Sequence, residues 1–542
     1  METEYDVVIV GTNIVQSVAA AALARAGKKV LIFDEAKVYG GENATLSLSE
    51  FQDVLRANEQ IPNRVEIESS LISTFSAKPL EAFECLETVG TPPTSTRLSD
   101  FNLDLLPYLV FSRGQCVDTI AESGVYRYLE FQQLDGTFFF NDDYSAPLLI
   151  TQSKSQIFAS QDLSMVEKRQ LMRFLQFCLD YHSTEKLDWF NDKNGAQNPG
   201  RSLSRPQNKT EDTDLRQKAV ENLDSVFSDF EINQVRMSQR LTNIVNYGIA
   251  LQGSSENELS IEEGMKRVGR YIKAMGRFGS TPFITCMYGT GEISQGFIRF
   301  CAVNNGTVAL RVRPIALYEN NELSVERIKV EDHHDFEEDI PARIKARLGV
   351  ILNSNFLSKE DALFSKVRPS QNLVSYRCTL LVNQSLFGEK YERLLFIIPP
   401  NKVVGHSFAI HGMQLDTKVK IVPTGFVLVH LQTKGLRTDR EIVVNRFNDV
   451  IRNLLQKNEN TQLIWKVLYL KECTFDYFLK PNIFVIGDES EKYNSSQVEL
   501  DDIFFRAKDI FDSLCPGQPF MPPSEAELKM RAEEAGSSLP DL

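Results

Sequence analysis

The residues with the clearest chemical meaning lie near the start of the printed sequence. Gly11 follows an apolar run at 5–10, and Asp34 follows a second apolar run at 28–33. A dinucleotide site needs two further glycines after the first, because the backbone must approach the pyrophosphate closely. This sequence has Asn13 and Gln16 at those positions. We therefore predict that no FAD or NAD is bound, and that Asp34 serves as a turn residue at the end of a strand.

Histidine and cysteine residues could also hold a metal or act as nucleophiles. His333 and His334 are adjacent in an acidic run, but adjacent loop histidines are usually solvated, and no histidine pair has helical spacing. The eight cysteines are scattered and form no Cys-x-x-Cys pair, which is typical of reduced thiols in a cytosolic protein. We therefore predict no metal site and no catalytic residues.

The bulk composition excludes several classes of protein. The formal net charge is −14, so a nucleic-acid partner is not expected, because phosphate binding needs a basic surface. Hydrophobic residues make up 42% of the 542 residues, which is enough for a large core. No apolar run approaches the roughly 18 residues that span a bilayer. The sequence lacks a signal-peptide pattern at its start and a prenylation box at its end, so we expect a cytosolic protein.

The elements that position Gly11 and Asp34 form a predicted β-α-β unit, with a strand over 5–10, a helix over 14–26 and a strand over 28–33. Ser260 and Glu263 form a capping box that opens a helix running to about Met275. Apolar periodicity predicts four further helices, over 102–131, 162–182, 231–251 and 442–456. The clearest later strands are predicted over 308–318, 418–423 and 425–433.

The predicted fold class is α/β with mixed α+β character. A sheet-based domain I is built from 1–129 and 276–510, and a helical domain II is inserted over 130–275. Residues 191–214 are polar and are predicted to form a mobile surface loop. Residues 511–542 carry four prolines and then a charged stretch, and are predicted to form a peripheral or disordered tail.

Three stretches carry a resemblance to a known family: 5–51, 165–181 and 276–311. They include Tyr-Gly-Gly-Glu at 39–42 and the spaced motif YGxGExxQGFxR at 288–299. In combination they resemble the superfamily of Rab GDP-dissociation inhibitors and Rab escort proteins. The stretches 101–120, 385–400, 425–435 and 511–525 are similar to the escort branch.

The resemblance implies an FAD-monooxygenase-like multisheet domain I with an inserted helical domain II, and no cofactor. It implies a non-catalytic escort that binds GDP-bound Rab GTPases and presents them to the alpha/beta heterodimer of Rab geranylgeranyltransferase. Such an escort shelters the geranylgeranyl lipid and contacts membranes transiently. Two alternatives remain open: a GDP-dissociation inhibitor that recycles prenylated Rabs, and an FAD-dependent oxidoreductase, against which the missing glycines argue.

The resemblance also implies a Rab-binding surface at Tyr39, Glu292, Arg299 and Leu310. An Arg fork and a carboxylate can pair with polar groups of a GTPase, and Tyr provides a rigid anchor. The alternative is that Glu292 and Arg299 pair with each other to fix a turn.

Two further surfaces are expected in domain II. An apolar groove would shelter the lipid, and its candidate lining residues are Phe174, Cys178, Val235, Leu241, Ile244 and Val245. The alternative is an ordinary helical core. The helix over 264–278 is rich in cations, and the family's docking surface for the transferase would include Arg270, Lys273 and Arg277. The alternative is a solvated charged face.

Overall fold

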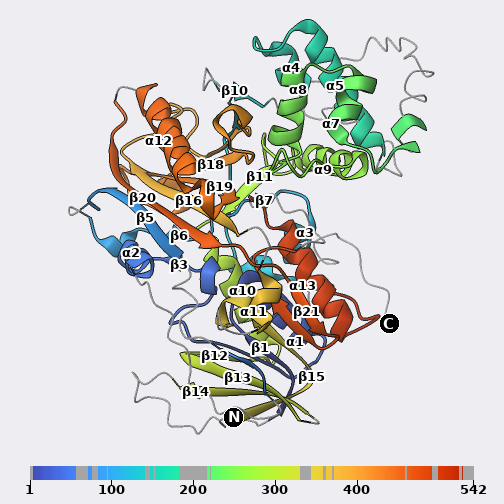
Figure 1. The fold of residues 1–542 in the computed structure, drawn as a ribbon, viewed down its shortest axis with the longest axis vertical. Helices are drawn as coiled ribbons and strands as arrows, with labels where there is room; N and C mark the ends of the chain where they lie inside the picture. The colour runs from blue at the N-terminus through green and yellow to red at the C-terminus, as the bar shows by residue number, and fades with distance from the viewer. Residues whose placement is uncertain are drawn as a thin grey trace.

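The computed structural model has two large β-sheets with helices on their faces, and a group of helices set apart at one end (Figure 1). Two further sheets are small, with three and two strands. The structure describes residues 4–56, 71–75, 83–93, 96–140, 147–150, 154–181, 217–219, 221–320, 322–329, 343–357, 362–368, 372–457, 460–490, 498–523 and 528. The predicted loop at 191–214 and the pair His333–His334 lie outside these residues.

The first large sheet contains the predicted β-α-β unit, which is confirmed as β1 (Glu4–Val10), α1 (Ile14–Arg25) and β2 (Val30–Asp34). Its strand order is β12-β2-β1-β15-β14-β13-β4, and β22 and β21 extend from β15. The bounds of the other strands are β4 Leu71–Thr74, β12 Thr307–Leu310, β13 Val312–Asn320, β14 Glu322–Lys329, β15 Arg343–Asn353, β21 Tyr477–Lys480 and β22 Ile483–Ile486. Strands β12, β2, β1, β15 and β22 run parallel, so their carboxyl ends share one edge.

Helices α1, α10 (Gly291–Val303) and α13 (Asp501–Leu514) pack together against the first sheet (Figure 1). Four consecutive alanines of α1, at 19–22, are at most 1% exposed. Small side chains let neighbouring helices approach closely, so this run favours tight packing on more than one face. Helix α3 (Gln115–Ser123) lies against α13.

The second large sheet is built from segments far apart in the sequence, in the order β10-β9-β17-β18-β19-β16-β20-β5. Its strands are β5 Phe83–Gly90, β9 Gly136–Phe139, β10 Leu148–Leu149, β16 Leu373–Val382, β17 Leu394–Ile398, β18 Ile410–Leu415, β19 Val427–Leu436 and β20 Leu463–Glu472. The predicted helix α12 (Arg440–Gln456) covers one face, and α2 (Leu48–Arg56) packs against β5. The strand predicted over 425–433 is therefore confirmed as part of β19.

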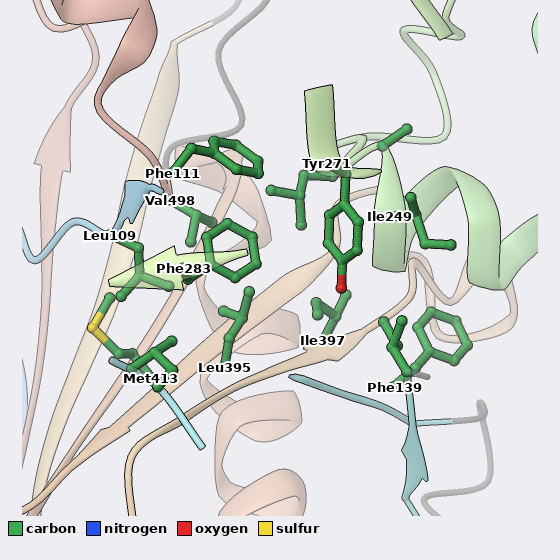
Figure 2. Packing of buried hydrophobic residues seen from close by; sticks show 14 of the residues in the cluster. Leu109, Phe111, Phe139, Ile249, Tyr271, Phe283, Leu395, Ile397, Met413 and Val498 are labelled. Atoms are coloured by element: carbon green, nitrogen blue, oxygen red, sulfur yellow. The ribbon is translucent and has the colours of Figure 1, made fainter. Parts of the chain in front are cut away.

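The separate group of helices contains α4 (Lys154–Ala159), α5 (Met165–Tyr181), α7 (Phe227–Phe230), α8 (Gln239–Asn243) and α9 (Ile261–Ala274), with π-helical turns η5 (Glu231–Val235) and η6 (Ile244–Ile249). The capping box is confirmed in part, since the Ser260 hydroxyl accepts the Glu263 N–H at 3.3 Å. Figure 2 shows Tyr271 and Ile249 of this group beside Phe139, Leu395 and Ile397 of the second sheet. One hydrophobic cluster therefore runs from the helices into the sheet.

Some element predictions are wrong, because strand partners come from distant segments. Residues 102–131 are not one helix: they hold β6 (Leu103–Asp104), β7 (Val110–Phe111), α3, a 3-10 turn η4 (Val125–Tyr128) and the start of β8 (Phe131–Gln133). Strand β6 pairs with β3 (Thr45–Leu46), and β7 and β8 pair with β11 (Phe283–Cys286). Residues 418–423 form a turn rather than a strand, with Lys420 at φ +63°.

The helical segment begins later than 130, and the chain end is more ordered than expected. Strands β8, β9 and β10 precede α4, and β9 pairs with β17 of the second sheet. At the other end, α13 crosses residue 511, Met521 is 1% exposed, and the Arg25 guanidinium donates to the Pro522 carbonyl at 3.1 Å. Residues 511–523 are therefore packed, while the division into two domains stays a prediction. Within the described residues, no helix is long and apolar enough to cross a bilayer.

Candidate functional site

The turn at Tyr39–Asn43 follows β2 and depends on its two glycines. Gly40 has φ +106° and Gly41 has φ +52°, a backbone region that favours glycine. A Cβ on Gly40 would lie 2.8 Å from the Ala44 Cα, and one on Gly41 would lie 2.4 Å from the Asn13 Oδ1. Tyr39 is half-buried against the hydrophobic cluster that contains α1 and α10. The turn therefore packs closely against the start of α1.

This turn occupies the place where a dinucleotide would bind. The Asn43 Oδ1 accepts the Ile14 N–H at 3.2 Å, at the start of α1, where a pyrophosphate would bind. The Gly40 N–H donates to the Thr12 Oγ1 at 3.0 Å. Asp34 accepts from the Thr12 N–H at 2.8 Å and from its hydroxyl at 2.7 Å, and burial raises the pKa of Asp34. Because these polar groups already hydrogen-bond to one another, the site does not fit FAD or NAD.

A buried charge cluster ties this turn to the second sheet. Lys471 of β20, 2% exposed, pairs with Glu42 at 2.9 Å and with Asp488, which follows β22. Burial raises the pKa of Glu42 to about 7, although the neighbouring ammonium group lowers it. Burial alone would lower the pKa of Lys471, but the two carboxylates raise it instead. The Glu of the Tyr-Gly-Gly-Glu motif is therefore an internal anchor and is not available at the surface.

The second motif, at the start of α10, is tied to the first through Thr45 and Asp104. Asp104 accepts from the Thr290 N–H and hydroxyl, both at 2.9 Å, and from the Thr45 hydroxyl at 2.6 Å. Thr45 Oγ1 in turn accepts the Gly291 N–H at 3.0 Å. Burial raises the pKa of Asp104 to about 6. A Cβ on Gly289, which has φ +110°, would lie 2.4 Å from Thr45 Oγ1, so glycine is required at this approach.

The four predicted surface residues lie on these adjoining elements. Glu292 is half-buried and accepts from the Gln295 amide at 3.0 Å, and burial raises the pKa of Glu292. Arg299 is exposed, and its guanidinium lies 4.5 Å from the centroid of the Tyr128 ring. Within the described residues no ion pair joins Glu292 to Arg299, so the predicted alternative of a mutual pair is wrong. Leu310 is half-buried at the end of β12, beside β2.

The predicted lipid-lining residues belong to the large hydrophobic cluster. Five of them are at most 2% exposed: Phe174, Cys178, Leu241, Ile244 and Val245. Val235 is partly buried against them. The ring of Phe174 lies 5.7 Å from that of Phe227, and a Cβ on Gly264 of α9 would lie 2.3 Å from Phe227. The structure therefore shows these residues packed as a core, and a lipid would enter only if helices moved apart.

Two of the four cations of α9 are used inside the molecule. Arg270 pairs with Glu499 at 2.9 Å and Asp501 at 3.5 Å, and its guanidinium lies 4.6 Å from the Phe111 ring centroid. Arg267 is 6% exposed and pairs with Glu263 of the same helix. The predicted alternative of a solvated charged face is therefore wrong for these two arginines.

The remaining docking candidates are more accessible. Arg277 donates to the Ser112 carbonyl at 2.8 Å and pairs with Asp118 at 3.2 Å, while its side chain stays 29% exposed. Lys273 is half-buried, and within the described ranges no ion pair engages it. In the same part of the chain, no three His, Cys, Asp or Glu side chains group as metal ligands would.

Residues 1–72 and 76–339 match the family model described as GDP dissociation inhibitor, which is more than half of the chain. The chain belongs to the GDP dissociation inhibitor family. The matched range contains both tied motifs and the helical segment, so the resemblance of 5–51, 165–181 and 276–311 to this superfamily is confirmed.

Several curated proteins are similar to the chain. It is 29% identical over 325 residues to Rab proteins geranylgeranyltransferase component A of Drosophila melanogaster, covering 59% of this chain and 55% of that protein. It is 25% identical over 445 residues to component A of Saccharomyces cerevisiae, covering 81% and 63%. It is 24% identical over 518 residues to Rab escort protein 1 of Arabidopsis thaliana, covering 87% and 86%. The first curated relatives are thus matched over less than two thirds of their length.

Solved structures support the same fold for this GDP dissociation inhibitor family member. A Rab GDI from Plasmodium falciparum superposes with a TM-score of 0.64 at 17% identity, covering 96% of this chain and all of that one. An oxidoreductase from Methanosarcina mazei superposes with a TM-score of 0.54 at 13% identity, covering 93% and 99%. The predicted mixed α/β fold class is confirmed.

Sequence reasoning missed the residues that hold the family motifs together. Thr45, Asp104 and Thr290 carry no local pattern that marks them as partners, because β3, β6 and α10 come from three distant segments. Asp488 had a usable signal, since it follows a short apolar run that ends in Gly487, as strand-end turn residues often do. Lys471 sits within an apolar strand, and a buried lysine there predicts a buried carboxylate partner.

Proposed function

We propose that this chain is an escort protein for Rab GTPases. It binds GDP-bound Rab proteins and presents their terminal cysteines to the alpha/beta heterodimer of Rab geranylgeranyltransferase. The transferase supplies the chemistry, so the chain is a non-catalytic partner. The chain then shelters the geranylgeranyl lipid, delivers the Rab protein through a transient membrane contact, and otherwise works in the cytosol.

The observation that carries the proposal is the similarity to relatives named as component A or escort protein. This similarity reaches 87% of the chain in the Arabidopsis thaliana protein. The hydrogen bonds that fill the degenerate dinucleotide site also support the proposal. Because the start of α1 and Asp34 are satisfied by Asn43 and Thr12, the adjoining elements are free to present a protein-binding surface.

The surface for the Rab protein would consist of Tyr39, Glu292, Arg299 and Leu310. Arg299 has no carboxylate partner within the described residues, so its guanidinium can donate to backbone or carboxylate groups of a GTPase. The Tyr128 ring holds it in one orientation, which lowers the entropy lost on binding. Half-buried Tyr39 offers an aromatic contact whose base is fixed by packing.

The lipid would enter between the helices that carry Phe174, Cys178, Leu241, Ile244 and Val245. Each methylene moved from water into such a core gains about 0.8 kcal/mol. Separation of the packed helices costs part of that gain, so the net affinity stays low enough for a bilayer to compete. The transferase would dock on the accessible side of α9, at Lys273 and at Arg277 just beyond the end of the helix, and Arg270 would support that helix from inside.

The test is a prenylation assay with purified components. Unprenylated Rab loaded with GDP is incubated with the transferase heterodimer and labelled geranylgeranyl diphosphate, with and without the chain. Label incorporation should depend on the chain and should fall in R299A. A matched control is R347A, because Arg347 is an exposed arginine on β15 that pairs with Asp6, away from α10. Folded wild-type chain that supports no incorporation would refute the escort function.

A second candidate function is a GDP dissociation inhibitor, because the matching family model carries that description. An inhibitor would extract already prenylated Rab from membranes and would fail to support prenylation of unmodified Rab. The two assays on one preparation therefore separate the candidates. A third candidate, an FAD-dependent oxidoreductase, conflicts with the occupied hydrogen-bond groups of Thr12 and Asp34. A visible flavin absorbance retained in stoichiometric amount after purification would restore it.

A further inference from the structure

A polar cavity lies between the second sheet and the end of β22. The cavity itself has a volume of about 30 Å³ and opens to solvent at its mouth. Strands β16 and β20 contribute Ser375, Arg377 and Lys471, Tyr108 comes from the segment after β6, and Asp488 and Glu489 follow β22. The cavity is outside the proposed Rab surface and outside the helical segment.

The hydrogen-bond donors of this cavity are incompletely used. Arg377 is 4% exposed, and one Nη donates to the Gln432 side chain at 2.7 Å, but its Nε has no partner. Within the described residues no carboxylate forms an ion pair with Arg377. The Ser375 hydroxyl, on a residue 5% exposed, also has no partner. In that same part of the chain no hydrogen bond engages the Tyr108 hydroxyl.

The carboxylates around the cavity are, in contrast, each paired with a cation. Asp488 pairs with Lys471 and also accepts from the Thr474 N–H at 2.9 Å. Glu489 pairs with Lys434 at 2.5 Å. Glu472, at the mouth, pairs with surface arginines. The unused capacity of the cavity therefore consists of donors, and these include a buried positive charge.

We propose that this cavity binds a small oxyanion, a carboxylate or a phosphate, with Arg377, Ser375 and Tyr108 as its donors. A buried guanidinium without a counter-charge is costly, and a bound anion with two or more oxygens would compensate it. The cavity has room for only a few water-sized groups, so it restricts the ligand to a small anion. The site is independent of Rab binding, so either assignment can fail without the other.

The test is thermal unfolding of the full chain in a chloride buffer of constant ionic strength. Inorganic phosphate and acetate are titrated separately, up to about 10 mM, where general salt effects on apolar burial stay small. Binding to the folded state alone should raise the wild-type Tm by about 2 °C at about a hundredfold excess over Kd. The anion that produces the shift assigns the ligand as a phosphate or a carboxylate.

Three variants identify the site. R377Q should abolish the shift, and Y108F and S375A should weaken it. The control R347Q removes an exposed arginine that pairs with Asp6 and does not line the cavity, so it should keep the wild-type response. If R377Q does not fold, Y108F and S375A decide the question, because each removes only one hydroxyl. The proposal is overturned if neither anion shifts the wild type, or if these variants respond as the wild type does.

Discussion

Replacement of Arg270 by alanine distinguishes a docking residue from an internal anchor. Arg270 lies on α9, while its partners Glu499 and Asp501 lie at the start of α13 and have side chains that are at most 1% exposed. The guanidinium also covers the Phe111 ring at 4.6 Å. Removal of Arg270 takes away the cation that is paired with both buried carboxylates, and it breaks the ion pairs that join α9 to the start of α13.

The magnitude follows from burial and distance. With an effective dielectric constant of about 20, Coulomb attraction is about 6 kcal/mol for the shorter pair and about 5 kcal/mol for the longer one, before desolvation is subtracted. Breaking one side of a buried pair costs about 3–5 kcal/mol. An unfolding entropy of about 2.1 cal/mol/K per residue, for a cooperative chain of this length, converts that loss into a Tm lower by about 3–4 °C.

The loss should also depend on pH. Burial raises the pKa of Asp501 to about 6 in the folded state, while Arg270 lowers it. At pH values between its unfolded and folded pKa, the folded state binds more protons, so the contribution of this carboxyl to stability falls as pH rises. Without Arg270 the folded pKa rises further. The destabilisation of R270A should therefore be larger at pH 8 than at pH 5.

The assay combines urea or thermal unfolding with transferase binding. R270A should lose stability, and K273A, on the same helix, should change it by less than about 1 kcal/mol, as exposed positions usually do. Adding E499Q and D501N to R270A should recover part of the loss, because it removes the uncompensated charges. Unchanged stability of R270A together with lost transferase binding would refute the internal role and favour docking.

Three other substitutions test the site. D104A should lower the free energy of unfolding by about 2–4 kcal/mol, since Thr290 loses its acceptor; an unchanged urea midpoint would contradict the tie. R299A should cost at most about 1 kcal/mol of stability, yet weaken GDP-Rab binding at least about tenfold in a titration; equal affinity would remove Arg299 from the surface. K471M should lower the free energy of unfolding by about 3–5 kcal/mol. Adding E42Q to K471M should restore part of that stability, and no recovery would contradict the buried pair of Lys471 and Glu42.

Several features could be predicted from the sequence because they depend on local interactions. The β-α-β unit and the capped helix α9 depend on neighbours within a few residues, and both are present. The absence of glycine at 13 and 16 predicted a site unsuited to a dinucleotide. In the structure the Asn13 side chain lies close against the turn at Gly41. Glycines 40 and 289 have positive φ, a requirement of the backbone itself.

Contacts between distant segments decided the rest. Residues 102–131 are apolar enough for a helix, but β6 and β7 find partners at Thr45–Leu46 and Phe283–Cys286. Tertiary pairing of this kind overrides local propensity.

Contacts between distant segments also decide which charged side chains are buried. The cations of α9 suggested an outer face, whereas Arg270 meets Glu499 and Asp501 more than 220 positions away along the chain. The sequence by itself determined the backbone conformations and the lost dinucleotide motif, because both depend on residue type at fixed positions. Only the tertiary structure decided which charges are buried as pairs and which remain available, because burial and partners depend on segments that meet after folding.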